Sequence, residues 1–247
     1  MNEKTGLLVS ARSLDEARSV INLGAAWLDI KEPSMGSLGR PSTDLIRALI
    51  RWPMPENIGL SIAGGEIRDW TSDLDQSIAG ILPSRFFLKI ALAHSSGLSW
   101  RSLASRIASS LRHPSQLILG YYADFAQADS PAWRDVVDAS TRLGSRYVLM
   151  DTCQKARGRL LDYHSASALQ EMISWAHQHG LRVALAGSLR LEDLSELENV
   201  GADWLGMRGA LCKNSERTSE LCPELLRLAL SMFPSSSRIE GLSHVIR

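Results

Sequence analysis

The sequence predicts a single-domain (β/α)8 TIM barrel of the α/β class, and three observations support this fold. The chain has 247 residues with 45% hydrophobic content, the usual size of one α/β barrel. Short apolar runs alternate with helix-like stretches along its length. A nucleotide-binding doubly wound sheet would give a similar alternation, but no glycine-rich dinucleotide fingerprint follows the first run, which continues as SARSLDEA.

Eight runs rich in β-branched or apolar residues are the predicted strands. In chain order they are Gly6 to Ala11, Trp27 to Lys31, Ile58 to Ile62, Phe86 to Ile90, Gln116 to Tyr122, Tyr147 to Asp151, Arg182 to Ala186 and Trp204 to Arg208. We expect the catalytic barrel to span residues 1–235. Residues 236–247 have no clear hydrophobic period and are predicted to form a frayed C-terminal tail.

Amphipathic stretches between these runs predict the helices, and their ends carry recognisable signals. Serines that favour a helix start precede four of them, at Ser13, Ser42, Ser99 and Ser165. Glycines that favour a left-handed residue at a helix end stand at Gly24, Gly144, Gly180 and Gly201.

Composition and charge restrict the class of partner. Lysine plus arginine (27) balance aspartate plus glutamate (27), and no basic stretch is interleaved with aromatic residues, so we expect no nucleic-acid partner. A small-molecule partner is favoured. The N-terminal apolar run turns polar by Ser10, too soon for a signal peptide or a membrane span, and this predicts a cytoplasmic protein without membrane contact.

The cysteines and histidines do not suggest a metal centre or a disulfide framework. Cys153, Cys212 and Cys222 have no C-x-x-C spacing, which fits a reducing compartment. His177 and His179 are two residues apart on a predicted helix, so they point in different directions and are expected at the surface. No metal site is therefore predicted.

Lysines are scarce in this chain, which makes each one a candidate for chemistry. Only five of the 27 basic residues are lysine: Lys4, Lys31, Lys89, Lys155 and Lys213. Arginine stays protonated, whereas a lysine amine can lose its proton and attack a carbonyl. Clustered ammonium groups lower one another's pKa, and we expect this effect to produce a neutral amine.

Active sites of these barrels lie at the carboxyl ends of the strands, and charged residues end several of the predicted strands. They are Asp29, Lys31, Lys89, Asp124 and Asp151, with Lys155 in the loop four residues after the sixth strand. Any one of them alone could be a solvated rim charge or part of an ion pair. Their occurrence together on separate strands favours a catalytic site.

The remaining candidates carry weaker signals. Lys213 is expected to have a structural or substrate-steering role, and Lys4 none. His94 follows the fourth strand and could reach the rim, and Cys153 has no histidine near it in sequence to activate a thiol.

The loops after the seventh and eighth strands are where such barrels commonly bind phosphate. The sequence reads LAGSL and GMRGA there. Gly187 and Gly209 would let backbone amides approach the anion, while Ser188 would add a hydroxyl and Arg208 a guanidinium. The alternative is that these glycines merely turn strand into helix, and position together with composition favours phosphate binding.

Seven segments together resemble the (5-formylfuran-3-yl)methyl phosphate synthases over nearly the whole chain. They are LLVSARSLDEA, LDIKEPSMGSLG, FLKIAL, YYADF, VLMDTCQK, ALAGSL and GMRGALC. The D-I-K-E-P-x-x-G-S-L-G stretch is the most specific, and it occurs in the same order as the D-T-x-x-K stretch. The resemblance implies a lyase that condenses two molecules of glyceraldehyde 3-phosphate into a phosphorylated furan aldehyde for methanofuran-type cofactors.

Residue by residue, the resemblance implies a Schiff-base lysine at Lys31 and a second essential lysine at Lys89. It implies an acid/base set at Asp29, Asp151 and Lys155. The chain departs from the family pattern in two loops: it reads IAGGEIRD after the third strand, where the family tends to carry G-D, and Ala156-Arg157 after Lys155, where D-G is usual. We assign no catalytic role to these loops.

In the mechanism that this family suggests, the Lys31 iminium activates the neighbouring carbon for proton loss, enamine attack and phosphate expulsion. Asp151 and Asp29 would move protons, while Lys89 and Lys155 would neutralise developing negative charge. No metal or organic cofactor is expected. Two alternatives remain open: a Schiff-base aldolase acting on another sugar phosphate, and a non-catalytic barrel that binds phosphorylated ligands or a protein. A homo-oligomer is compatible with the sequence.

Overall fold

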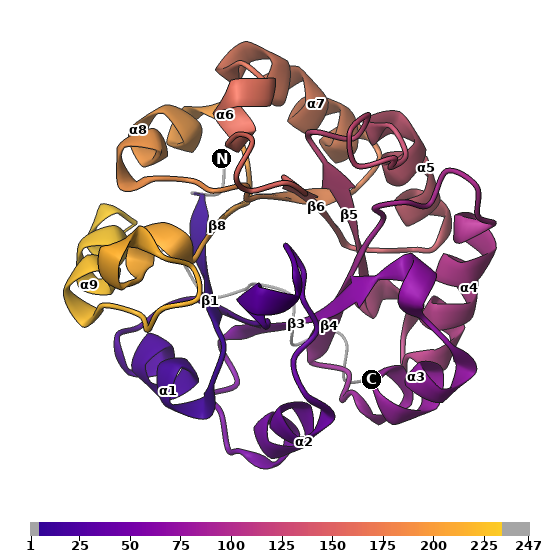
Figure 1. Ribbon diagram of the computed structural model, residues 1–247, viewed down its shortest axis with the longest axis horizontal. Helices are drawn as coiled ribbons and strands as arrows, with labels where there is room; N and C mark the ends of the chain where they lie inside the picture. The colour runs from indigo at the N-terminus through magenta and orange to yellow at the C-terminus, as the bar shows by residue number, and fades with distance from the viewer. Residues whose placement is uncertain (1–4, 234–247) are drawn as a thin grey trace.

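Eight parallel strands close into a barrel in which β1 pairs with both β2 and β8, so the predicted fold class is confirmed (Figure 1). The computed structural model describes residues 5–233. The strands are β1 (Gly6–Ala11), β2 (Trp27–Ile30), β3 (Gly59–Glu66), β4 (Phe86–Ala91), β5 (Leu117–Tyr122), β6 (Tyr147–Asp151), β7 (Arg182–Leu185) and β8 (Trp204–Met207). The expected tail at 236–247 and Lys4 lie outside the described residues.

Helices form the outer ring around these strands (Figure 1). They are α1 (Leu14–Asn22), α2 (Thr43–Arg51), α3 (Ser72–Ser77), α4 (Trp100–Ser110), α5 (Trp133–Arg142), α6 (Leu160–Tyr163), α7 (Ala166–Gln178), α8 (Leu194–Leu197) and α9 (Pro223–Met232), joined in places by single 3-10 turns. Within residues 5–233, none of the helices is both long and apolar enough to cross a bilayer.

The predicted helix signals are confirmed with one exception. The hydroxyls of Ser13, Ser42 and Ser165 accept hydrogen bonds from backbone amides of the first turn. Ser99 makes no such bond, because its backbone (φ −74°, ψ 53°) is not in the extended conformation that aims a cap hydroxyl at the helix. The four predicted helix-ending glycines all have positive φ, between 69° and 87°.

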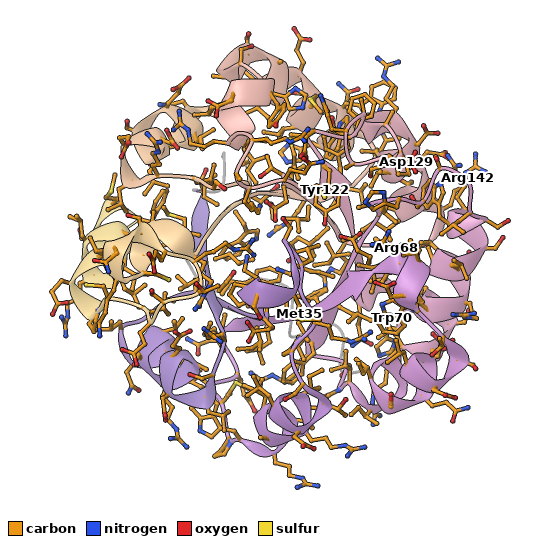
Figure 2. All side chains as sticks on the ribbon, viewed as in Figure 1. Met35, Arg68, Trp70, Tyr122, Asp129 and Arg142 are labelled. Atoms are coloured by element: carbon orange, nitrogen blue, oxygen red, sulfur yellow. The ribbon has the colours of Figure 1, made fainter. Side chains whose placement is uncertain are left out.

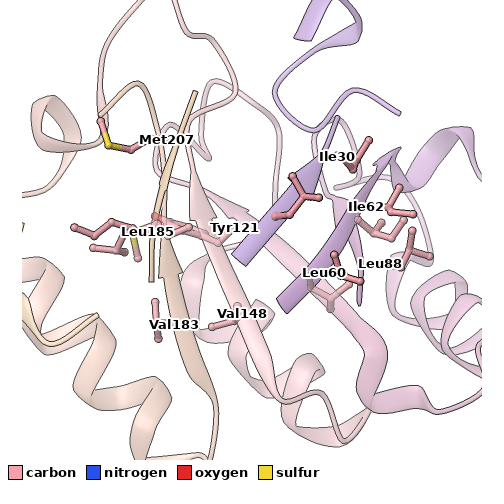
Figure 3. Close-up of a cluster of buried hydrophobic side chains, with 14 of the residues drawn as sticks. Ile30, Leu60, Ile62, Leu88, Tyr121, Val148, Val183, Leu185 and Met207 are labelled. Atoms are coloured by element: carbon pink, nitrogen blue, oxygen red, sulfur yellow. The ribbon is translucent and has the colours of Figure 1, made fainter. Parts of the chain in front are cut away.

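The main hydrophobic core lies between the barrel and its helices. Outward-facing strand residues such as Ile62, Leu88 and Val148 pack there, and Figure 3 shows the side chains of this cluster. Each of these three side chains is completely buried. Burial of this area provides most of the stability that holds the strands in register.

A second cluster fills the interior of the barrel near the amino-terminal ends of the strands. Trp27, Phe87, Tyr147 and Trp204 project inward from β2, β4, β6 and β8, with neighbouring ring centroids 5.0–5.4 Å apart. Gly6 makes room for one of these rings, because a Cβ there would lie 2.3 Å from the Trp204 ring. The aromatic layer closes this end, so polar chemistry is confined to the opposite end.

Above the aromatic layer, each odd-numbered strand has one small residue that faces inward. Ser10, Ala63, Gly120 and Ala184 occupy these positions on β1, β3, β5 and β7, in register with larger or charged residues on the neighbouring strands. The even-numbered strands therefore have space in which to extend long polar side chains.

The loop after β2 folds over part of the barrel mouth. It includes a 3-10 turn (Pro33–Met35), and Met35 lies over the middle of the barrel in Figure 2. Leu38 is buried, and a Cβ on Gly120 would lie 3.2 Å from its Cδ1. The Gly65 amide donates to the Leu38 carbonyl at 3.0 Å. This loop fills the side of the mouth near β3 and β5, leaving the opposite side open.

Candidate active site

A cavity of about 710 Å³ opens at the carboxyl ends of the strands, on the side of β6, β7 and β8. Its wall includes Lys31, Asp151 and Lys155, residues 186–192 and 208–210, and Arg217. This volume is typical of a small-molecule site. Six of its lining side chains are cationic and two are anionic, so the cavity favours an anionic ligand. The six cations are Lys31, Lys155, Arg159, Arg190, Arg208 and Arg217.

Lys31 follows the last residue of β2, and its amide donates to the Ala11 carbonyl at 3.0 Å, which fixes the backbone. Burial lowers the pKa of its amine to about 7, against the opposing attraction of Asp151 and Asp29. The neighbouring ammonium groups of Lys89 and Lys155 lower it further, as predicted, but loss of water is the larger cause. A substantial fraction of this amine is therefore neutral near neutral pH.

Asp151 and Lys155 form an ion pair in the cavity wall, four residues apart at the end of β6. Burial favours the neutral carboxylic acid, but the charges of Lys155 and Lys31, together with hydrogen bonds from Lys155 and the Thr152 amide, lower the pKa of Asp151 below its usual value. One carboxylate oxygen also accepts the Thr152 amide at 2.8 Å. Burial lowers the pKa of Lys155, and Asp151 partly opposes this shift.

Asp29 and Lys89 lie beneath the cavity rather than in its wall. The Lys89 ammonium is 2.6 Å from Asp29 Oδ1, and both side chains are almost completely buried. The same oxygen accepts the Ser61 hydroxyl at 2.7 Å, while Oδ2 accepts the Ser10 hydroxyl at 2.9 Å. Trp27 Nε1 in turn donates to Ser61 at 3.0 Å. These contacts hold Asp29 in one orientation, which favours a fixed charge over the expected proton carrier.

Asp124 does not reach the cavity. Its two oxygens accept the backbone amides of Cys153 and Gln154 at 2.7 and 2.9 Å, and its side chain is buried. It therefore holds the loop that carries Lys155. A catalytic role was predicted because Asp124 follows a strand, but its hydrogen bonds indicate a positioning role.

The predicted phosphate-binding residues all line the cavity, but the hydrogen-bond donors of Arg208 are already occupied within the described residues. Gly187 and Ser188 have positive φ (113° and 54°), and a Cβ on Gly187 would lie 3.1 Å from Leu160. Arg208 uses all five N–H groups within the described residues, on Glu16 and on the carbonyls of Ser10, Arg217 and Ser219. Its guanidinium is therefore not free to bind phosphate, in contrast to the expectation from the sequence.

Sequence reasoning missed two features of the mouth. Glu66 ends β3 and accepts the Tyr122 hydroxyl at 2.8 Å and the Ala93 amide at 2.7 Å. Burial raises the pKa of Glu66, although both hydrogen bonds oppose this. The predicted third strand ended at Ile62, so Glu66 was not considered a strand-end residue. Arg217 also lines the cavity but lies in an irregular loop that no sequence pattern singled out.

The weaker candidates remain outside the cavity. Lys213 is exposed and pairs with Glu220 at 2.8 Å. His177 is exposed and bonds Asp203, His179 bonds the Trp175 carbonyl, and His94 is exposed. Over residues 5–233, no group of histidine, cysteine and acidic side chains has the arrangement of a metal site.

Comparison with known proteins identifies the family. The model of the 4-HFC-P synthase family matches residues 7–229. The chain belongs to the 4-HFC-P synthase family. Among members with a curated name, the (5-formylfuran-3-yl)methyl phosphate synthase of Methanopyrus kandleri is 31% identical, covering 85% of this chain and 91% of its own length. A putative (5-formylfuran-3-yl)methyl phosphate synthase of Methylorubrum extorquens is 32% identical, covering 87% and 86%.

Solved structures show the fold that this 4-HFC-P synthase family member shares with other barrels. Phosphoribosyl anthranilate isomerase of Thermus thermophilus superposes with a TM-score of 0.60 at 16% identity, covering 93% of this chain and all of that one. A protein described as an aldolase, QR15, has a TM-score of 0.55 at 12% identity, with 94% and 98% covered. At these identities the likeness concerns the barrel alone.

Proposed function

We propose that this protein is a lyase that condenses two molecules of glyceraldehyde 3-phosphate to (5-formylfuran-3-yl)methyl phosphate through a Schiff base on Lys31. The observation that carries the proposal is a cavity amine whose pKa is lowered to about 7, beside the Asp151 carboxylate. Membership of the 4-HFC-P synthase family supports the product. The product would serve the synthesis of methanofuran-type cofactors.

The reaction balances without an oxidant or a reductant. Two triose phosphates contain the atoms of the furan aldehyde phosphate plus one phosphate and two water molecules. The Lys31 nitrogen adds to the aldehyde carbon of one substrate, and loss of water gives an iminium. Removal of a proton from the neighbouring carbon gives an enamine, whose electron pair either forms the new carbon–carbon bond or breaks the carbon–oxygen bond to phosphate.

The surrounding residues supply proton transfer and charge. Asp151 lines the cavity beside Lys31 and is assigned the proton transfers. Lys155 neutralises negative charge that develops on oxygen, and the Asp29–Lys89 pair fixes the electrostatic environment beneath the iminium. Gly187, Ser188 and Gly209 are assigned to phosphate.

The proposal is tested by incubating the purified protein with glyceraldehyde 3-phosphate and measuring furan absorbance. We expect the parent protein to form the furan aldehyde and to be trapped by borohydride at Lys31. Lys31→Arg keeps the positive charge but removes the deprotonated amine, so it should lose both turnover and trapping with the fold intact. Lys89→Arg should retain some trapping while turnover falls.

Asp151→Asn should form the iminium but stall at proton transfer, leaving a trappable adduct and little furan. Trapping without furan in the parent protein would instead indicate an aldolase acting on another sugar phosphate. Absence of any covalent adduct would indicate a barrel that only binds its ligand. An adduct mapped to Lys155 or Lys89 would overturn the assignment of Lys31.

A further inference from the structure

The positive charges in the cavity wall differ in how far carboxylates neutralise them. Lys155 pairs with Asp151, and Arg190 with Glu192. Arg159 pairs with both Asp193 and Asp162. Arg208 pairs with Glu16. Each of these cations has a carboxylate partner that an incoming anion would have to compete with.

Arg217 is the exception among the cavity arginines. Within the described residues, one of its N–H groups donates to the Gly36 carbonyl at 2.7 Å, and no carboxylate lies within ion-pair distance. The side chain is partly buried in the cavity wall. Burial lowers the pKa of its guanidinium, although the Asp151 carboxylate opposes this shift. A guanidinium remains protonated in such a setting, so it is a charged donor with unused N–H groups.

The loop that carries Arg217 is held by Arg208. Arg208 Nε donates to the Arg217 carbonyl at 2.6 Å, and Nη2 donates to the Ser219 carbonyl at 3.1 Å. The Arg12 side chain also donates to the carbonyl of Thr218. The Gly36 contact ties the far end of Arg217 to the loop over the barrel mouth. The backbone and the tip of Arg217 are therefore both fixed before any ligand binds.

We propose that Arg217 is the guanidinium that binds the substrate phosphate, and that Arg208 is a positioning residue that holds Arg217 in place. The fork of N–H groups on arginine matches two phosphate oxygens, and the free donors lie in a cavity with excess positive charge. The identity of the phosphate ester rests on the proposed function, whereas the binding of a phosphate dianion by Arg217 does not depend on it. Arg217 thus takes the phosphate-binding role that the sequence assigned to Arg208.

Calorimetric titration with inorganic phosphate tests this proposal independently of catalysis. We expect Arg217→Gln to weaken phosphate binding roughly 10- to 100-fold, the value of one charge-assisted interaction. Arg217→Lys should recover part of this loss. The matched control is Arg157→Gln, an exposed arginine after β6 outside the cavity, which should change binding less than about threefold. Unchanged phosphate affinity in Arg217→Gln, an equal loss in Arg157→Gln, or no binding by the parent protein would overturn the proposal.

A second measurement separates phosphate recognition from damage to the fold. Cyanoborohydride trapping is compared for glyceraldehyde 3-phosphate and for unphosphorylated glyceraldehyde. In Arg217→Gln, the loss of apparent affinity for the phosphorylated aldehyde should exceed the loss for glyceraldehyde by about tenfold or more. Equal losses would show a structural role and contradict the proposal. If the parent traps neither aldehyde, the Schiff-base function fails, and the phosphate titration still decides the role of Arg217.

The positioning role of Arg208 is tested by a double-mutant cycle. Arg208→Lys should weaken phosphate binding in the parent background. In the Arg217→Gln background it should cause little further loss, because Arg208 acts through Arg217. Additive losses would show that Arg208 contacts the anion directly and would contradict this part of the proposal.

Discussion

At the scale of single residues, the proposed chemistry depends on the exclusion of water from one amine, that of Lys31. Lys31 sits just beyond β2 with its backbone fixed, and burial lowers its pKa to about 7. In the proposed mechanism the neutral form is the nucleophile, so protonation of Lys31 would remove its reactivity. Asp151 favours the protonated form, and the same carboxylate is assigned the later proton transfers.

This shift predicts the pH dependence of iminium trapping. The rate of cyanoborohydride trapping at Lys31 should rise as pH increases through about 7, because the amine loses its proton there. Asp151→Asn removes a charge that raises the pKa of Lys31, so its midpoint should move to lower pH. Trapping rates measured by mass spectrometry between pH 5 and 9 would check both. A midpoint near the ordinary lysine value of 10.5 would contradict the prediction.

Sequence patterns predicted which residues lie at the site better than they predicted the hydrogen-bond and ion-pair partners of those residues. Lys31 and Asp151 were recognisable because each ends a short apolar run, and a strand end is a local feature. The saturation of Arg208 was not predictable, since it depends on Glu16, 192 residues away in sequence. The partners of Asp124 were not predictable for the same reason, because they are backbone amides of a loop 29 and 30 residues further on.

At the scale of strands and loops, the interior polar network links four neighbouring strands. Asp29 on β2 contacts Ser10 on β1, Ser61 on β3 and Lys89 on β4. The sequence predicted these strands but not the network, because serine in a strand has no distinctive pattern. The network places a buried ion pair directly below the cavity.

Removing one partner of this ion pair should lower the free energy of unfolding far more than removing both charges. Lys89→Met leaves Asp29 buried without its counter-ion and should lower the free energy of unfolding by about 3–5 kcal/mol. Asp29→Asn combined with Lys89→Met should recover much of that loss, since no unpaired charge remains. Urea unfolding of the single and double variants provides the measurement. Arg142→Gln, which breaks an exposed pair with Asp138, is the control and should change stability by less than about 1 kcal/mol.

The loop over the barrel mouth depends on a close backbone approach at Gly39. A Cβ there would lie 2.1 Å from the Glu32 carbonyl oxygen, so Gly39→Ala should open the loop and displace Leu38. We expect a loss of stability of about 2 kcal/mol or more, together with reduced trapping at Lys31. Gly97→Ala is the matched control, because a Cβ at Gly97 meets nothing within 4 Å. Equal melting temperatures for the two variants would refute the close contact.

At the scale of the whole molecule, the closed barrel separates a sealed end from an open one. Eight apolar runs predicted the fold correctly, since strand and helix periods repeat regularly along the chain. The position of the opening on one side of the barrel could not be predicted. It depends on a contact between Leu38 and Gly120, 82 residues further along the sequence. The local spacing of apolar residues contains no information about a contact between segments so far apart in the sequence.

The aromatic layer at the sealed end gives a test of the barrel interior. Trp27 Nε1 donates to Ser61, whereas Trp204 Nε1 is buried without a partner in the described residues. Both Trp→Phe substitutions remove ring volume, but only Trp27→Phe also breaks a hydrogen bond to the network beneath the cavity. We expect it to be more destabilising than Trp204→Phe by about 1 kcal/mol. Chemical unfolding would check this order, and the reverse order would contradict it.

The alternation of charged and small residues between neighbouring strands affects how such an enzyme can evolve. The charged groups of the proposed mechanism, Lys31, Lys89 and Asp151, lie on or directly after β2, β4 and β6. The small inward-facing residues Ala63, Gly120 and Ala184 come from β3, β5 and β7. The groups assigned to the proposed chemistry and the small residues packed among them therefore lie on different strands. Substitutions at Ala63, Gly120 or Ala184 would change the packing of the barrel interior, while the amine and the carboxylate of the proposed mechanism stay in place. Selection can thus alter the packing of the barrel interior and the proposed chemistry in separate steps.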